Sequence, residues 1–204
     1  MKVISGLEDF LSDFQYFKLQ GYDAFYQLFE SGSKLIVINS TPYRDGIMLE
    51  IQLAVKVDDI EECLFRFYKQ EYDKLSLSFW ESLTQIYSDV PKRSLIENPI
   101  ELSKWISEIE TALVKKGFNW LDGLSDLKSI SNYLSKKVFD KVQKPTNIFK
   151  LSQRSYLIRT LLGEKMTEAI FYEYYEQMQF YKVPEHQLEE FLEFKNFLKV
   201  HLLK

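Results

Sequence analysis

The side chains best suited to acid–base chemistry lie on one short segment in the first half of the chain. Glu50, Gln52 and Lys56 alternate along an expected strand and therefore point to the same face. Arg44 and Asp45 stand just before that strand. Acidic and basic groups that share a sheet face are the groups that general acid–base catalysis uses. The sequence thus offers Arg44, Asp45 and Glu50 as a candidate sheet-face site, with an ordinary solvated strand face as the simpler interpretation.

Residues that form covalent intermediates or bind transition metals are few. Cys63, the single cysteine, shares a helical face with apolar neighbours, which is typical of a small core residue. The acidic residues around it would raise the pKa of the thiol, the wrong direction for a nucleophile. His186 and His201 are too far apart in sequence to form a ligand pair, and the glycine-rich and paired-histidine motifs are absent. We therefore expect no catalytic residue, no metal site and no cofactor.

A second candidate site is the basic segment formed by residues 128–159. It carries eight lysines and arginines against the single acid Asp140. The side chains of this segment expected to bind a partner are Lys136, Lys137, Lys141, Lys144, Lys150 and Arg154. Tyr133, Phe149 and Tyr156 are interleaved with them, and basic and aromatic residues together are what single-stranded nucleic acid binding uses. The net charge of −4 makes nucleic acid the less favoured ligand.

An acidic segment, residues 164–193, follows the basic one. It holds eight glutamates against Lys165 and Lys182. Three interpretations remain open for the two segments. The charges solvate helix faces, they pair with one another within or between copies of the chain, or the basic segment binds an acidic protein.

Strand patterns dominate the elements that would position the sheet-face residues. Strands are expected at 22–29, 34–39 and 47–57, with Pro42 and the dipeptide Asp45-Gly46 in the turn between the last two. Residues 47–57 alternate between apolar and polar, which is typical of an antiparallel strand whose second face is solvated or partly covered. Asp58 is expected to cap a helix, and residues 74–97 favour a fourth strand.

From Asn98 onward the pattern is helical. Asn98 as cap and Pro99 at the first helical position begin a helix that Gly117 is expected to end. Further helices are expected at 125–137, 153–162, 164–181 and 185–203, with a long loop at 140–152. The aromatic run at 171–181 places most of its rings on the apolar stripe of its helix, and only Tyr172 and Phe180 point elsewhere. The run is therefore expected to be mainly core.

These patterns predict an α+β protein. An antiparallel β-meander of three to four strands with flanking helices is expected in residues 1–97, and an all-helical half in residues 98–204, packed together as one compact unit. One cysteine excludes an intramolecular disulfide and suits the cytoplasm. The apolar runs are too short to span a membrane, and early acidic residues argue against a signal peptide.

The strand–turn–strand pattern of residues 21–57 resembles a bacterial family of domains of unknown function. The resemblance implies a short antiparallel sheet followed by helices, among them a pair at the carboxyl terminus. Families of this kind often include accessory proteins and toxin-neutralising (immunity) proteins. The resemblance implies no catalytic residue.

The sequence favours a non-catalytic cytoplasmic protein that binds an acidic protein or itself, with an immunity-type role as one form of that function. One alternative is a small enzyme whose carboxylates converge on the sheet around Glu50. Another is binding of RNA or single-stranded nucleic acid through residues 128–159.

Overall fold

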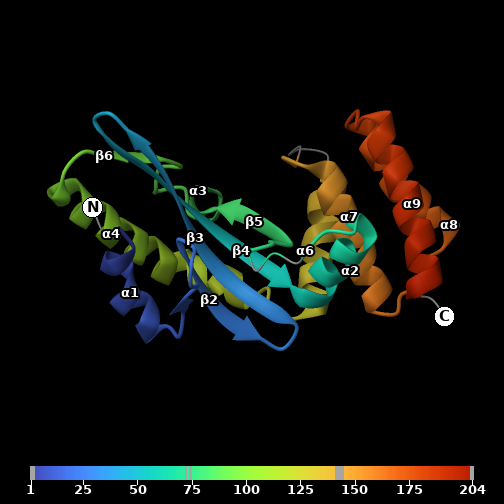
Figure 1. Ribbon diagram of the computed structural model, residues 1–204, viewed down its shortest axis with the longest axis horizontal. Coiled ribbons are helices and arrows are strands. Elements are labelled where there is room, and N and C mark those ends of the chain that lie inside the picture. Colours follow the sequence, from blue (N-terminus) through green and yellow to red (C-terminus); the bar gives the residue numbers. More distant parts are fainter. Residues whose placement is uncertain (1–2, 72, 74, 141–144, 203–204) are drawn as a thin grey trace. The chain divides into compact units, whose positions relative to one another are not determined.

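The computed structural model describes residues 3–71, 73, 75–140 and 145–202 and has the predicted α+β fold (Figure 1). Two compact units divide the chain. The sheet unit comprises Met1–Asp58 and Asp73–Ser125, and the helical unit comprises Asp59–Tyr72 and Asp126–Lys204. This division does not coincide with the expected boundary at residue 98. The helices that follow Asn98 directly belong to the sheet unit, and the helix after Asp58 belongs to the helical unit.

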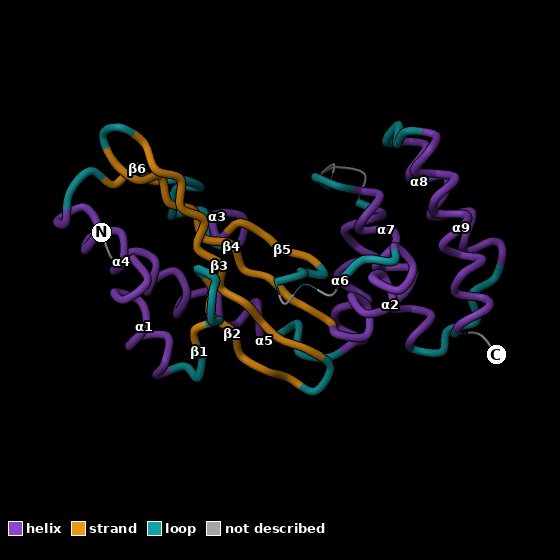
Figure 2. Tube along the Cα trace, viewed as in Figure 1, coloured by secondary structure: helices purple, strands orange, loops and turns teal. Residues whose placement is uncertain are grey.

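One antiparallel sheet organises the described part of the sheet unit (Figure 2). Its strands are β1 (Phe17–Lys18), β2 (Ala24–Phe29), β3 (Gly32–Tyr43), β4 (Gly46–Val57), β5 (Phe79–Ser82) and β6 (Ser94–Ile96). They follow the order β1-β2-β3-β4-β5, and β6 pairs with β4. The predicted meander is confirmed, and the segment expected to give a fourth strand supplies both β5 and β6.

The β3–β4 hairpin is longer than predicted. The sequence places Pro42 in the turn, whereas the structure pairs Pro42 with Ile47 inside the ladder. Arg44 and Asp45 alone make the turn. Proline fits a strand wherever its missing N–H is not needed by a neighbour. The hairpin therefore continues past the residue that was expected to end it.

The two faces of β4 are both covered. The buried residues of the predicted apolar face are Leu49, Ile51, Leu53, Val55 and Val57. On the other face Ala54 is fully buried, and Glu50 and Lys56 are only 7% and 6% exposed. The expectation of a solvated or partly covered face is therefore wrong for these residues. Leu75 and Leu77 pack against the cluster that contains Ala54, and ion pairs neutralise the two buried charges.

Helices also complete the sheet unit. They are α1 (Val3–Asp13), α3 (Leu83–Ile86), α4 (Pro99–Ala112), one π-helical turn η1 (Leu113–Gly117) and α5 (Phe118–Asp122). Asn98 caps α4 as predicted, since its side chain accepts hydrogen bonds from the backbone of Ile100 and Glu101. The predicted helix end at Gly117 is wrong, because helical turns continue through α5. A Cβ on Gly117 would lie 3.3 Å from Leu53, so this glycine permits close packing of the helix on the sheet.

The described helices of the second unit are α2 (Asp58–Tyr68), α6 (Leu127–Phe139), α7 (Ile148–Leu161), α8 (Glu168–Phe180) and α9 (Glu185–His201). α7 begins inside the segment that was expected to be a loop. The side chain of Asn147 caps it by accepting a hydrogen bond from the backbone of Lys150. No described helix is long and apolar enough to cross a membrane.

The aromatic run of α8 is mainly core, as predicted. Phe171 and Tyr174 are 2% and 0% exposed. Phe171 stacks on Phe191 of α9 with ring centroids 5.2 Å apart. The Tyr174 hydroxyl shares a 2.8 Å hydrogen bond with Ser155 of α7. These contacts hold α8 between α7 and α9 and fix which of its residues face outward.

Candidate functional site

The structure separates the three sheet-face candidates. Arg44 and Asp45 are exposed in the hairpin turn. Glu50 lies about 17 Å further along β4 at the usual rise of a strand. Its carboxylate accepts a hydrogen bond of 3.0 Å from Arg93 Nε, so it serves a structural ion pair. Within the described ranges, no three histidine, cysteine or carboxylate side chains are grouped to hold a metal ion.

Cys63 is buried in α2, as predicted, with 2% of its surface exposed. Burial raises the pKa of its thiol to about 11, and Glu62 adds to this shift while Arg66 opposes it. His186 and His201 are exposed on α9. Cys63 therefore lacks the environment of a nucleophile.

We therefore expect Cys63 to react slowly with a disulfide reagent in the native protein. With a pKa of about 11, roughly 0.1% of the thiol is ionised at pH 8, and the thiolate is the reactive form. Time courses of labelling with and without denaturant measure the effect, because unfolding removes the burial. Fast native labelling with a thiol pKa below its usual value would reopen the enzyme hypothesis.

The basic segment presents fewer charges than its sequence suggests. Lys136 and Lys150 are exposed, and Lys137 Nζ lies 5.6 Å from the ring centroid of Tyr133. Lys141 and Lys144 lie outside the described residues. Phe149 and Tyr156, the other two aromatic residues proposed for base stacking, are core residues with 6% and 3% exposure. They offer no surface on which bases stack.

Arg154 is an internal residue, and its predicted role in partner binding needs correction. Its Nε and Nη2 donate hydrogen bonds of 3.1 and 3.0 Å to the two carboxylate oxygens of Glu61 in α2. Only 12% of the Arg154 side chain and 2% of the Glu61 side chain are exposed. A bidentate pair of this kind fixes α7 to α2. Arg154 is thus part of the framework of the helical unit.

A polar cluster lies on the same helices. The Tyr68 hydroxyl donates to Glu190 of α9 and lies 2.9 Å from Gln153 Oε1. Burial is the largest cause that raises the pKa of Tyr68, and the hydrogen bond to Glu190 adds to it. Tyr68 therefore stays protonated over the neutral range. The cluster ties α2 to α7 and α9.

Pairing between the basic and acidic segments is limited in the described residues. Arg159 Nε contacts Glu164 Oε2 at 2.7 Å. Glu168 contacts Lys195 and Lys199 instead, and these hydrogen bonds lower the pKa of its carboxyl group. Internal pairing therefore explains only part of the acidic segment.

Five other glutamates of α8 and α9 are exposed and form no ion pair with any residue that the structure describes. They are Glu173, Glu176, Glu185, Glu189 and Glu193. Large apolar side chains emerge from the same two helices. Tyr172, Phe180 and Leu192 are 54%, 65% and 45% exposed. We call these eight residues the acidic surface.

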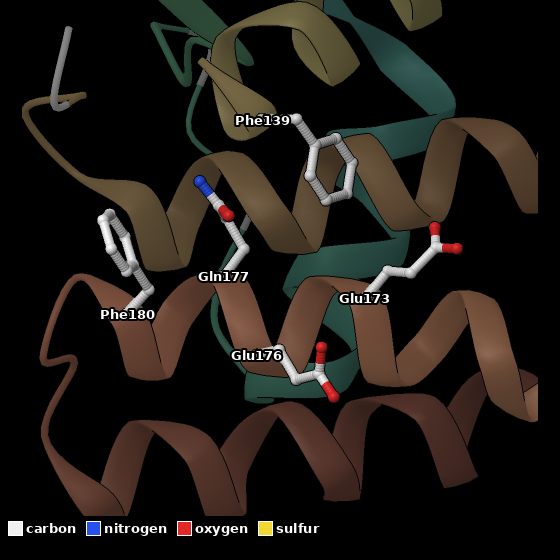
Figure 3. A pocket seen from close by; sticks show the side chains of 5 residues that line it. All are labelled: Phe139, Glu173, Glu176, Gln177 and Phe180. Atoms are coloured by element: carbon white, nitrogen blue, oxygen red, sulfur yellow. The ribbon is translucent and has the colours of Figure 1, made fainter. Parts of the chain in front are cut away.

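A cavity of about 430 Å³ opens at one end of this surface (Figure 3). It is lined by Phe139 at the end of α6 and by Glu173, Glu176, Gln177 and Phe180 of α8. The four α8 residues are spaced i, i+3, i+4 and i+7, so they share one helix face. The sequence alone shows this spacing, but it does not show that Phe139 of α6 lines the same cavity.

Contacts below the cavity hold its two walls together. The Phe139 ring packs edge-on against Tyr174, with centroids 5.0 Å apart. The Tyr181 hydroxyl donates a hydrogen bond of 2.5 Å to the carbonyl of Asp140. The ends of α6 and α8 are therefore fixed relative to each other within the helical unit.

The cavity joins three kinds of side chain. Figure 3 shows the Gln177 amide between Phe180 and Phe139, with Glu173 and Glu176 nearer the beginning of α8. Carboxylates attract cations, and aromatic faces bind cations and apolar chains. The arrangement suits binding of a cationic group that also has an apolar part.

Comparisons with models of protein families, with curated proteins and with solved structures find no match for this chain. The resemblance of residues 21–57 to a bacterial domain family is therefore untested and stays a prediction.

Proposed function

We propose that this protein is a non-catalytic interaction protein that binds a basic protein through the acidic surface of α8 and α9. The supporting observation is that the acidic surface carries five exposed glutamates without an ion pair among the described residues, together with the exposed side chains of Tyr172, Phe180 and Leu192. A helix face that only meets solvent normally carries polar residues. Interfaces combine apolar and aromatic anchors with charged surroundings. The acidic surface has both components.

The sign of the charge selects the partner. Like-charged glutamates attract a basic surface, accelerate encounter with it and reject acidic proteins. Proteins that act on nucleic acids carry such basic surfaces. An immunity-type role, in which the chain covers the basic cleft of a nucleic-acid-directed toxin, is the form of this function that we favour.

Two observations weigh against the alternative functions. Glu50 is paired with Arg93, away from Arg44 and Asp45, which removes the basis for an acid–base site on the sheet. The burial of Phe149 and Tyr156 removes the expected stacking residues for single-stranded nucleic acid.

A capture experiment with charge-matched variants tests the proposal. Lysate proteins are captured on the immobilised chain, on E185Q/E189Q/E193Q, and on the control E8Q/D9N/D13N, which neutralises exposed acids of α1. We expect basic proteins on the wild type and the control, and at least about tenfold less on the α9 variant. Raising the salt from about 0.15 to 0.5 M should release them, since it shortens the screening length.

The same experiment has two contrary outcomes. Equal capture by all three chains shows that the acidic surface is not the binding site. Acidic proteins that are lost only with K136E/K150E show that the partner is acidic and binds the basic segment instead. Analytical ultracentrifugation of the pure chain identifies self-association as a third explanation of the exposed surface.

A further inference from the structure

The cavity on α8 contains a buried polar group without a partner. Gln177 is 9% exposed, and its Nε2 atom has no hydrogen-bond partner among the residues the structure describes. A buried amide N–H that donates to nothing costs about 1–3 kcal/mol. Figure 3 shows this amide projecting into the cavity between Phe139 and Phe180. An acceptor bound in the cavity that reaches this amide would satisfy the unpartnered donor.

We propose that this cavity binds an arginine side chain of the basic partner, together with the backbone carbonyl next to it. This inference rests on the proposed function and names the group that the acidic surface recognises. In it, Gln177 Nε2 donates to the peptide carbonyl. Glu173 and Glu176 accept hydrogen bonds from the guanidinium group.

Geometry and chemistry favour arginine. Gln177 and Glu173 are one helical turn apart, about 6 Å, which is a distance that the arginine side chain spans. Phe139 and Phe180 offer aromatic faces on which a planar guanidinium and its alkyl chain stack. Lysine has the charge but neither the planar group nor the paired donors. A cavity of about 430 Å³ is large enough for one side chain and its peptide group.

Short peptides test the inference on the whole chain. The probe is acetyl-Gly-Arg-Gly-amide, and its control carries citrulline, which has nearly the same shape and no charge. We expect the arginine peptide to bind with a Kd on the order of 1 mM, as befits one anchored side chain, measured by titration calorimetry or NMR chemical shifts. The citrulline peptide should bind at least about tenfold more weakly, because the charge-assisted hydrogen bonds are lost.

Matched variants of the protein locate the site. E173Q/E176Q and Q177L should each weaken the arginine peptide by about five- to tenfold. The control E8Q/D9N removes two exposed charges from α1, outside the acidic surface, and should change the Kd by less than about twofold, since exposed charges away from the cavity are screened. Circular dichroism checks that all variants are folded.

Two results would overturn the cavity assignment. Equal weakening by E173Q/E176Q and E8Q/D9N indicates general attraction to the acidic side chains of the chain, and the proposed function is then decided by the capture experiment alone. No preference for the arginine peptide over the citrulline peptide has the same consequence. If E185Q/E189Q/E193Q captures basic proteins as well as the wild type does, the proposed function is contradicted. The peptide experiment still shows whether the cavity binds arginine.

Discussion

Replacing Arg154 by alanine is expected to lower the free energy of unfolding of the helical unit by about 3–5 kcal/mol. The reason is the carboxylate that stays behind. Glu61 is 1% exposed, and both its oxygens accept hydrogen bonds from Arg154. Without the guanidinium, folding must bury an unpaired charge. Urea unfolding followed by far-UV circular dichroism measures the loss.

Two further variants separate the buried charge from other causes. E61L/R154M removes both charges and should recover most of the stability, because apolar residues of similar volume can replace a buried ion pair. K104A breaks the exposed pair of Lys104 and Glu108, 3.7 Å apart within α4, and should cost less than about 0.5 kcal/mol. If R154A costs no more than K104A, the pair of Arg154 and Glu61 does not stabilise the packing of α7 on α2.

Arg154 also shows where charge composition misleads. Residues 128–159 contain eight basic residues, and no feature of the neighbouring sequence indicates that Arg154 is buried. The partner of Arg154 is 93 residues away in α2, so only the tertiary fold brings the two together. The exposed Lys136 and Lys150 differ from Arg154 in burial, and burial is the property that composition does not report.

Elements with one buried face were predictable. The alternation of residues 47–57 predicted β4, and the apolar stripe of residues 171–181 predicted the core of α8, since each periodicity reflects contact with a single neighbouring layer. α7 has no such stripe. Its polar residues Ser152, Gln153 and Ser155 are buried with its apolar ones, so its early turns look like a loop.

The cavity could not be predicted from the sequence for a related reason. The spacing of Glu173, Gln177 and Phe180 shows a shared face of α8, but such faces are ordinarily solvated. Its candidacy as a site depends on the unpaired donor of Gln177 and on Phe139, which reaches it from α6. Both facts are properties of packing between helices.

Phe191→Ala is the second variant for which a large loss is expected, about 3–5 kcal/mol in the free energy of unfolding. Phe191 is fully buried on α9. Its ring stacks on Phe171 and meets Tyr156 and Tyr174 at centroid distances of 5.6 and 6.5 Å. Alanine would leave a cavity that these three large rings cannot fill without moving. The loss combines transfer of the ring to water with the contacts forfeited around the empty space.

The next residue in the chain is the matched control for this variant. Leu192 is 45% exposed, belongs to the acidic surface and shares the backbone environment of Phe191. Leu192→Ala should cost less than about 1 kcal/mol, because nearly half of the residue stays exposed to water and its truncation leaves no enclosed cavity. Leu192→Ala should also weaken capture of the basic partner. Phe191→Ala should weaken capture only to the extent that it unfolds the protein. Equal losses of stability for the two variants would contradict the packing of α8 on α9, and with it the positioning of the acidic surface.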